Sequence, residues 1–429
     1  MRIAMLTNNY KPFIGGVPIS IERLADGLKS IGHDVFIFAP SYENQVEEEN
    51  VIRCKSIITK TDKYTLPNMF DVKLEKRFKE LNIDIIHVHH PILMGNLGLY
   101  LGKKYNVPVV FTYHTRYEQY LHYVKVYNAI EERRKVENNK NLIYIEDKIL
   151  NYTKNNLTCG YLNKFANKCD MIFAPTNLIK EQLQESGIKS NIQVIPTGLD
   201  ESYFKEEKEV SNAIRKKYIQ DKKYLFCTVA RLVKEKNLEF LIRGLKELKS
   251  REGDCFKSLI IGEGPLKENL KSLAKKLGLE DNIVFLNSVS NDCIGNYYRA
   301  CDLFLFSSQS ETQGIVLLEA MAAKKPVVAV KASGVIDVVK NNINGYITDN
   351  DEKEWANKVS YLLSNDSIRK DLSKGAYYTS LQYMNSNIAK QVEENYIKVM
   401  TEHFIHRLKT KTHRKIYINR AIKEKILYK

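Results

Sequence analysis

The sequence predicts an α/β protein with two Rossmann-like, doubly wound domains that face each other across a cleft. Short apolar runs that end at turn residues alternate with amphipathic segments of helical length, which is typical of βαβ units and a parallel sheet. This alternation occurs twice, once from Met1 to about Gly198 and again from about Tyr224. A chain of 429 residues also exceeds what one ordinary core accommodates. Ligands of such domains bind at the carboxyl ends of the strands.

The individual elements follow from these runs. We predict strands over Arg2–Thr7, Asp34–Ala39, Ile83–His87, Val107–Tyr113, Met171–Pro175, Ile192–Pro196, Tyr224–Val229, Ser258–Gly262, Asn282–Leu286, Leu303–Ser307, Pro326–Val330 and Gly345–Thr348. Helices are predicted over Val17–Ile31, Leu74–Leu81, Leu238–Ser250, Leu266–Leu277, Ile315–Ala323, Glu352–Leu363 and Asn387 to about Leu408. Residues 124–158 are rich in Lys, Glu and Asn and are predicted to be an inserted helical excursion.

A hinge is predicted at Ile195-Pro196-Thr197-Gly198-Leu199-Asp200, where Pro and Gly follow a strand and a charged segment continues to about Lys223. We therefore expect one domain over residues 1–198 and another over 199–380. A helix over 381–408 is expected to pack back on the first domain, followed by a basic tail over 409–429 with nine Lys and Arg from Ile405 onward against one Glu.

Composition restricts the class of protein. A hydrophobic fraction of 44% and a charged fraction of 27% are those of a soluble globular chain, and no run approaches the roughly 20 apolar residues that span a bilayer. The N-terminus is predicted to be a strand, not a signal peptide. Seven scattered cysteines without a Cys-x-x-Cys pair indicate a reduced, cytoplasmic protein. The net charge of +15 indicates an anionic partner, or else a Lys-rich compositional bias.

The most informative stretch runs from Ser310 to Glu319. An apolar strand leads into a polar turn containing Gln313 and Gly314, and an apolar helix begins at Ile315-Val316. This arrangement directs backbone N–H groups and the positive end of a helix at a phosphate. Glu311 and Glu319 bracket the turn. Two carboxylates beside a phosphate-binding turn favour a ligand with both hydroxyls and phosphates, such as a nucleotide sugar.

Two further turns of the second domain belong to this prediction. Arg231 and Lys236 follow the strand Tyr224–Val229 and can reach a diphosphate, whose developing negative charge fixed cations stabilise. The alternative is an ordinary solvated basic turn. The turn Gly262-Glu263-Gly264-Pro265 follows another strand and is predicted to form the wall beside a nucleobase.

In the first domain, Gly15-Gly16 opens a helix and permits close approach of a ligand, although a plain tight turn is the alternative. The pattern is not Gly-x-Gly-x-x-Gly, which counts against NAD. His114 ends a strand among tyrosines, where it can bond a sugar hydroxyl or shield positive charge at the anomeric carbon. His87, His89 and His90 lack a carboxylate or Cys at ligand spacing, so no metal site is expected.

A basic amphipathic helix is predicted around Leu74 and Phe78. Such a helix can lie on an anionic membrane, and each basic residue near that surface contributes about 1 kcal/mol. An ordinary surface helix packed on the sheet is the alternative. The four basic residues concerned are Lys73, Lys76, Arg77 and Lys79.

Together these motifs resemble the retaining glycosyltransferases that have two Rossmann-like domains (the GT-B fold) and a Glu-x7-Glu signature. The resemblance covers nearly the whole chain up to about residue 400. Within that family, the segment from Thr112 to Tyr123 looks like that of bacterial diacylglycerol glucosyltransferases, which make monoglucosyldiacylglycerol from UDP-glucose. The motifs that carry the family resemblance are Gly15-Gly16-Val17, His114, residues 195–200, Arg231 with Lys236, residues 262–265, and Glu311 with Glu319.

The resemblance implies a role for each motif. Arg231 and Lys236 would hold the diphosphate of a UDP-sugar, Glu319 the ribose and Glu311 the donor sugar. His114 would assist in positioning the sugar. The first domain would face the acceptor and the membrane, and the second would bind the nucleotide sugar without a metal or cofactor. The donor-binding set would comprise Gly15, Gly16, Gly264, Gln313, Gly314, Ile315, Val316 and Glu319.

The resemblance further implies a cytoplasmic enzyme that is peripherally associated with the inner face of the cell membrane, where the basic helix around Arg77 docks. Asn287 departs from the family pattern, which often has Gly there, and residues 124–158 and the basic tail are longer than usual. Alternatives are the same chemistry on a soluble or polysaccharide acceptor, a UDP-sugar epimerase, and a basic binding protein without activity. No nucleic-acid partner is expected.

Overall fold

The structure is a computed structural model that describes the whole chain except residues 14, 59–64, 115–158 and 428–429. For residues 410–427 it describes the helical backbone alone. The predicted excursion over 124–158 lies outside the described residues. The chain divides into two compact units. The first contains Met1–Ala174, Leu183–Ile195 and Ala389–Lys429, and the second contains Pro175–Gln182 and Pro196–Ile388.

The first unit is built on a parallel sheet with the strand order β3-β2-β1-β6-β7-β8-β9. Strand order reverses between β1 and β6, the place where doubly wound sheets bind ligands. The strands are β1 (Arg2–Leu6), β2 (Asp34–Pro40), β3 (Val51–Cys54), β6 (Ile85–Val88), β7 (Val109–Thr112), β8 (Met171–Ala174) and β9 (Asn191–Val194), with β4 (Ser56–Ile58) and β5 (Thr65–Pro67) pairing separately. Helices of this unit include α1 (Gly16–Ser30), α2 (Val72–Glu80), α3 (Met94–Tyr105) and α6 (Cys159–Ala166). Helix α7 (Asn177–Glu185) crosses the division, and its residues up to Gln182 belong to the second unit.

The second unit contains a parallel sheet with the order β12-β11-β10-β13-β14-β15. Its strands are β10 (Tyr224–Val229), β11 (Phe256–Ile261), β12 (Ile283–Leu286), β13 (Leu303–Phe306), β14 (Val327–Val330) and β15 (Gly345–Thr348). Its helices include η4 (Glu201–Phe204), α8 (Lys208–Ile219), η5 (Lys234–Lys236), α9 (Leu238–Glu252), α10 (Lys267–Lys276), α11 (Asn291–Ala300), α12 (Ile315–Ala322), α13 (Ser333–Val338), α14 (Glu352–Ser364) and α15 (Asp366–Leu381).

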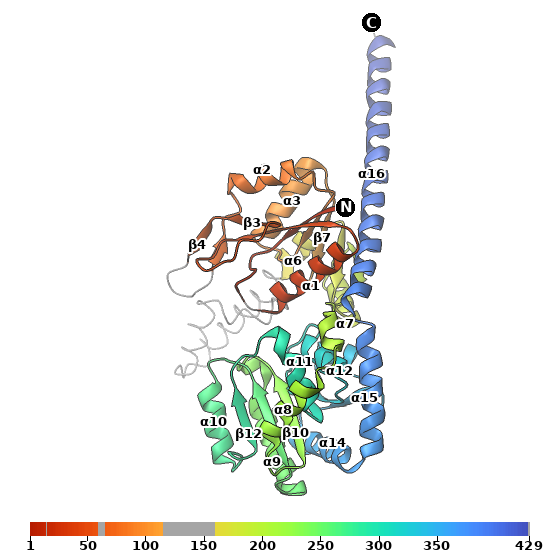
Figure 1. Cartoon of the computed structure of the whole chain (residues 1–429). Coiled ribbons are helices and arrows are strands. Elements are labelled where there is room, and N and C mark those ends of the chain that lie inside the picture. The colour runs from red at the N-terminus through yellow and green to blue at the C-terminus, as the bar shows by residue number, and fades with distance from the viewer. Residues whose placement is uncertain (14, 59–64, 115–158, 428–429) are drawn as a thin grey trace, which may run out of the picture. The chain divides into compact units, whose positions relative to one another are not determined.

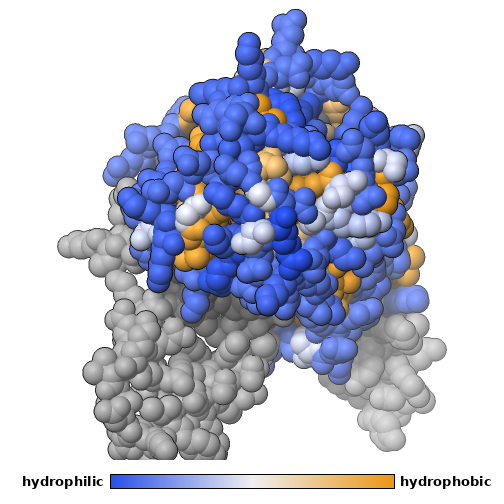
Figure 2. Space-filling model, turned by 90° about the horizontal axis from the view of Figure 1, so that it is seen from below, coloured by the Kyte–Doolittle hydropathy of each residue, from blue (hydrophilic) through white to orange (hydrophobic). Residues whose placement is uncertain are grey.

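Apolar side chains bury both faces of this second sheet, because successive residues of a strand point to opposite sides. Phe226 contributes to the cluster that contains Trp355, whereas its neighbours Leu225 and Cys227 contribute to the cluster that contains Tyr298. Helices therefore cover both faces of the sheet. The face of the molecule in Figure 2 is mainly hydrophilic, with apolar residues in small separate spots.

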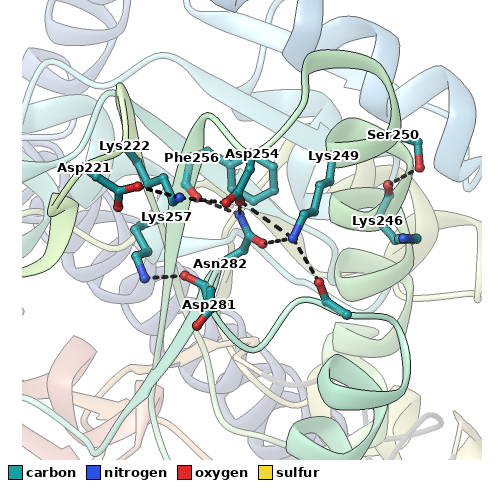
Figure 3. Close-up of polar contacts among 11 residues, drawn as sticks. Asp221, Lys222, Lys246, Lys249, Ser250, Asp254, Phe256, Lys257, Asp281 and Asn282 are labelled. Carbon is teal, nitrogen blue, oxygen red and sulfur yellow. Dashed lines mark hydrogen bonds and ion pairs between the residues drawn. The ribbon is translucent and has the colours of Figure 1, made fainter.

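A polar network closes the amino end of this sheet (Figure 3). Lys222 Nζ donates to Asp254 over 2.7 Å, and Asn282 Nδ2 donates to the other Asp254 oxygen over 2.7 Å. Lys249 Nζ donates to Asn282 Oδ1 over 2.7 Å. The Lys222 and Asn282 hydrogen bonds lower the pKa of Asp254 to about 2. These hydrogen bonds connect the amino ends of β10, β11 and β12, at the end of the sheet opposite the predicted site.

The final helix, α16, runs without a break from Asn385 to Leu427 (Figure 1). The sequence predicted a helix to about Leu408 followed by a tail, and the structure instead continues the helix through the basic residues. Its segment from Ala389 onward belongs to the first unit. There Val392 and Tyr396 are buried, and the Tyr396 hydroxyl bonds His87 Nδ1 over 2.6 Å.

The predicted hinge region also contains structure. The Leu199 N–H donates to Tyr383 O, and the Asn385 N–H donates to Leu199 O, so this segment is attached to the start of α16. The charged connection beyond it contains α8, whose Arg215 bonds Ala300 O and Asp302. In the described residues, no helix combines the length and the apolar character needed to cross a bilayer.

Candidate active site

Two loops meet at the carboxyl end of the second sheet because β10 and β13 are hydrogen-bonded neighbours. Lys236 lies in η5 after β10, and Glu311 lies in the turn after β13. The Ser307 hydroxyl donates to Lys236 O over 2.8 Å, which fixes one loop against the other. Parallel strands thus bring together residues 75 positions apart.

The central contact of the site is an ion pair between Lys236 Nζ and Glu311 Oε1 at 2.5 Å. Both side chains are mostly buried, with exposed fractions of 19% and 14%. Their attraction is therefore less screened than that of a surface pair. The pair places a cation and a carboxylate side by side at the carboxyl end of the sheet.

The helix α12 begins beside this pair. Its N-cap, Gly314, has φ +77°, a left-handed conformation that favours glycine. Among the described residues no side chain caps this helix. The first helical residues, Ile315 and Val316, are half-buried. The backbone therefore presents the helix's positive end at the turn, as an anion site requires.

The start of helix α13 supports this turn. The Ser333 hydroxyl and the Gly334 N–H donate to Glu311 O over 2.6 and 3.0 Å. A Cβ on Gly334 would lie 2.6 Å from the Gln313 nitrogen, so only glycine permits this approach. Ser333 and Gly334 are supporting residues that sequence reasoning missed, since no local pattern connects them with Glu311.

Gln313 was predicted to bind the donor, and the structure shows what its side chain contacts. Its amide accepts from the Thr197 N–H over 2.7 Å and donates to Thr197 O over 3.1 Å. The side chain is buried. It holds the segment after β9 against the α12 turn, so any contact of Gln313 with a phosphate falls to its backbone.

Glu319 lies within α12 and is buried, with Oε2 accepting a hydrogen bond from the Tyr298 hydroxyl over 3.0 Å. Tyr298 belongs to α11 and is fully buried, which together with the Glu319 charge raises the pKa of its phenol well above the usual value. The phenol therefore remains a hydrogen-bond donor. Sequence analysis identified Glu319 but missed Tyr298, because the contact depends on the packing of two helices.

The turn after β11 packs on the turn after β10. The Leu232 N–H donates to Glu263 O over 2.8 Å, and a Cβ on Gly264 would lie 2.4 Å from Leu232 O. Gly262 has φ +146°, and its Cβ would lie 2.0 Å from Ala230 O. These glycines let the predicted nucleobase wall approach the Arg231–Lys236 loop. Arg231 itself is exposed in this loop.

In the first unit, four histidines gather at the carboxyl ends of β6 and β7. His89 Nδ1 and His114 Nε2 share a hydrogen bond of 2.8 Å, and His87 Nε2 bonds the Thr112 hydroxyl over 2.6 Å. Burial lowers the pKa of His87 to about 3 and of His90 to about 4, and it holds those of His89 and His114 well below the usual value.

Because their pKa values are lowered, the four imidazoles of this cluster are neutral at physiological pH. His114 can therefore act as a hydrogen-bonding group but carries no charge of its own. Within the part of the chain that the structure describes, no group of three or more His, Cys, Asp and Glu side chains could hold a metal ion.

The remaining predicted residues also lie in the first unit. Gly15 precedes α1, and a Cβ on Gly16 would meet no atom of the described residues within 4 Å. In α2, Leu74 and Phe78 are buried against the unit. Its basic side chains point outward, and the exposed ones are Lys73, Lys76, Arg77 and Lys79.

Comparison with known proteins identifies the class. Residues 14–203 match the model described as Glycosyltransferase Family 4, and residues 210–379 match that of Glycosyl transferases group 1. The alpha-monoglucosyldiacylglycerol synthase of Acholeplasma laidlawii is 30% identical over 416 residues, which cover 93% of this chain and 98% of that relative. The chain belongs to the glycosyltransferases. The enzyme of the same name from Streptococcus pneumoniae is 28% identical to this glycosyltransferase, over 92% of this chain and 86% of the relative.

Solved structures agree on the fold. Anabaena Alr3699/HepE in complex with UDP matches with a TM-score of 0.71 at 18% identity, covering 93% of this glycosyltransferase and all of that chain. Sucrose-phosphate synthase from Thermosynechococcus elongatus matches with a TM-score of 0.72 at 17% identity, over 94% and 99%. The predicted GT-B class, with two Rossmann-like domains, is confirmed.

Proposed function

We propose that this glycosyltransferase moves a hexose, glucose first among the candidates, from a UDP-sugar to membrane diacylglycerol and retains the anomeric configuration. The observation that carries the proposal is the Lys236–Glu311 pair beside the start of α12. Support for the acceptor comes from the two relatives named as monoglucosyldiacylglycerol synthases. Support for the donor comes from the fold neighbour Anabaena Alr3699/HepE, which has been solved in complex with UDP, with UDP and glucose, and with UDP-glucose.

The diphosphate would lie against the α12 turn. Lys236 and Arg231 would contact its oxygens from one side, and the N–H groups of Ile315 and Val316 from the other. When the bond between the anomeric carbon and the phosphate oxygen breaks, its electron pair leaves with UDP. Fixed cations and helix N–H groups stabilise that charge, so this proposal assigns no cofactor or metal to the step.

The two carboxylates would divide the rest of the donor between them. Glu319, oriented by Tyr298, would accept hydrogen bonds from the ribose hydroxyls. Glu311 would accept them from the hexose, and a bound diphosphate would draw Lys236 toward its own oxygens. The acceptor hydroxyl would attack from the face that UDP leaves and pass its proton to the departing phosphate oxygen, which retains configuration.

The first unit would receive the acceptor, with residues 1–198 as the acceptor and membrane domain and 199–380 as the nucleotide-sugar domain. Neutral His114 would hydrogen-bond the hexose, and Gly15 and Gly16 would admit the ligand close to the backbone. The surface of α2 supports docking to an anionic membrane, because the exposed Phe70 and Val72 adjoin its four outward basic residues. The enzyme would thus act as a cytoplasmic, peripheral membrane protein at the inner face of the cell membrane.

The test is transfer of labelled hexose from UDP-glucose or UDP-galactose in the presence of mixed vesicles that contain diacylglycerol. Label in the organic phase, dependent on diacylglycerol, is the expected result. Label that stays in water but joins an added soluble sugar would replace the lipid acceptor with the soluble one. One relative, 25% identical over 94% of this chain, is named D-inositol 3-phosphate glycosyltransferase. A soluble inositol phosphate is therefore the acceptor to compare with diacylglycerol.

The α2 surface can be tested in the same assay. Replacing Lys73, Lys76, Arg77 and Lys79 with Gln removes about 1 kcal/mol of membrane attraction for each charge. We expect weaker binding to anionic vesicles and slower lipid glycosylation, with UDP affinity unchanged. Unchanged vesicle binding would remove α2 from the proposal.

A further inference from the structure

The outer side of α16 exposes large apolar residues. Ile397, Phe404 and Leu408 are spaced by seven and four positions and so share one face of the helix. They and Ile405 are 45–58% exposed. The residues that attach α16 to its unit, Val392, Tyr396 and Val399, fall on a different face of the helix and are buried.

Charge distinguishes this end of the helix from the rest. From Ile405 to Lys429 the chain carries nine Lys and Arg against a single Glu. Arg407 and Lys409, the last two of these basic residues with described side chains, are exposed. The helical backbone continues from there to Leu427. Basic residues therefore follow directly in sequence on the exposed apolar face of the same helix.

We propose that α16 from Ile397 onward is a membrane-docking helix that lies on an anionic lipid surface, separate from α2. Exposed Phe and Leu next to Lys and Arg on a helix is the composition of interfacial helices, whose apolar side enters the headgroup region. A single weak signal gives only reversible binding, and two signals are needed for stable association. The α2 surface and α16 supply those two signals.

The charge also argues against the other occupants of this face. A second copy of α16 would bring two strongly basic helices together, and like charges repel at short range. A nucleic acid would satisfy the cations but would leave Phe404 and Leu408 without an apolar partner. An anionic bilayer can bind both kinds of residue, because its phosphate groups would contact the Lys and Arg side chains and its acyl chains would contact the Phe and Leu side chains.

The inference builds on the proposed function only in its choice of a membrane, and it can be tested without any transfer reaction. The experiment is sedimentation of the full-length protein with vesicles of phosphatidylcholine, with or without phosphatidylglycerol. The test variant is Phe404→Ser with Leu408→Ser. The matched control is Ile336→Ser with Ile343→Ser, two exposed apolar residues of the second unit.

We expect the wild type and the control to bind phosphatidylglycerol vesicles, and the test variant to bind roughly tenfold more weakly. Changing Arg407 and Lys409 to Gln should weaken binding roughly fivefold for each charge. UDP affinity, measured without lipid, should stay the same in every variant, which shows an intact donor site. Each variant is made twice, once with α2 unchanged and once with the four basic residues of α2 replaced by Gln. Without the α2 charges we expect weaker vesicle binding that still depends on Phe404 and Leu408.

Three results would overturn the inference. Vesicle binding could be the same for the test variant and the wild type. Binding could be equal on neutral and anionic vesicles. Sedimentation velocity could reveal a dimer that Phe404→Ser with Leu408→Ser abolishes, which would assign the face to a second copy. If transfer fails for all proteins while vesicle binding behaves as expected, the proposed acceptor is wrong and the docking helix stands.

Discussion

The Tyr298 hydroxyl lies 3.0 Å from Glu319 Oε2 and donates a hydrogen bond to it inside the second unit. Both side chains are buried, so neither can exchange this bond for water without cost. Glu319 is thus held in one orientation by a residue that belongs to another helix. A carboxylate that binds ribose hydroxyls needs such a fixed orientation.

The first prediction concerns this bond. Tyr298→Phe removes the hydroxyl but keeps the ring, so the fold should persist while Glu319 loses its donor. A hydrogen bond to a charged group contributes about 1.5 kcal/mol, which predicts a rise in the donor KM of about tenfold with little change in kcat. Steady-state kinetics with UDP-glucose and with its 2′-deoxyribose analogue provide the check. The KM values of wild type and variant should differ less with the analogue, which lacks the ribose 2′-hydroxyl, than with UDP-glucose. An equal rise in KM with both donors would contradict the role of Tyr298 in orienting Glu319.

The second prediction concerns Lys236. Lys236→Gln removes the cation that faces Glu311 and, by the proposal, the leaving diphosphate. Loss of one such group typically lowers kcat roughly 100- to 1,000-fold. Lys234→Gln is the matched control, because Lys234 lies two residues earlier in the same loop and is exposed. A Lys236→Gln enzyme as active as the control would show that this cation takes no part in turnover.

The third prediction concerns the close approach of two turns. Gly262→Ala should destabilise the protein, because its φ is +146° and its Cβ would meet Ala230 O at 2.0 Å. Gly253→Ala is the control: its φ is +72°, but its Cβ would meet no atom within 4 Å. Ala at a positive φ costs about 1 kcal/mol alone. Urea unfolding should show a clearly larger loss for Gly262→Ala, and equal losses would refute the contact.

The fourth prediction concerns pH. The folded state holds the pKa of His87 near 3 and that of His90 near 4, below the value of about 6.5 in an unfolded chain. The folded state therefore binds fewer protons, so its stability is complete above pH 6.5 and is lost as the pH falls below it. Each such group removes up to about 1.4 kcal/mol per pH unit.

Urea unfolding between pH 7 and pH 5 measures this loss, before carboxylates such as Asp254 begin to titrate. The free energy of unfolding should fall across that range. A stability that is flat or that rises toward pH 5 would show that these histidines are not held neutral.

The sequence predicted much of this architecture from particular runs. All twelve predicted strands are present, within about two residues at each end, because apolar runs between turn residues are strong local signals. The helix α3 was missed because Gly95, Gly98 and Gly102 make its sequence a weak helix former. Packing explains them: a Cβ on Gly98 would lie 2.4 Å from Val88, and one on Gly102 would lie 2.5 Å from Val109.

The candidate site was predictable to a similar degree. Glu311 and Lys236 stand out because each lies in a turn that follows a strand, and Glu319 stands out because it lies in the helix that the Gly314 turn opens. Tyr298, Ser333 and Gly334 do not, since their importance arises only when α11 and α13 pack beside the α12 turn. The contact of the Gln313 side chain with Thr197 could not be predicted either, because it depends on how the segment after β9 packs on the α12 turn.

The most direct test of the account is proton NMR analysis of the product formed from α-linked UDP-glucose and diacylglycerol, together with measurement of the UDP released. The account predicts an α-glucosyl diacylglycerol and one UDP for each sugar transferred. It also predicts that both vanish together in Lys236→Gln. A β-linked product would contradict retention, and an isomerised donor without any glycolipid would contradict transfer itself.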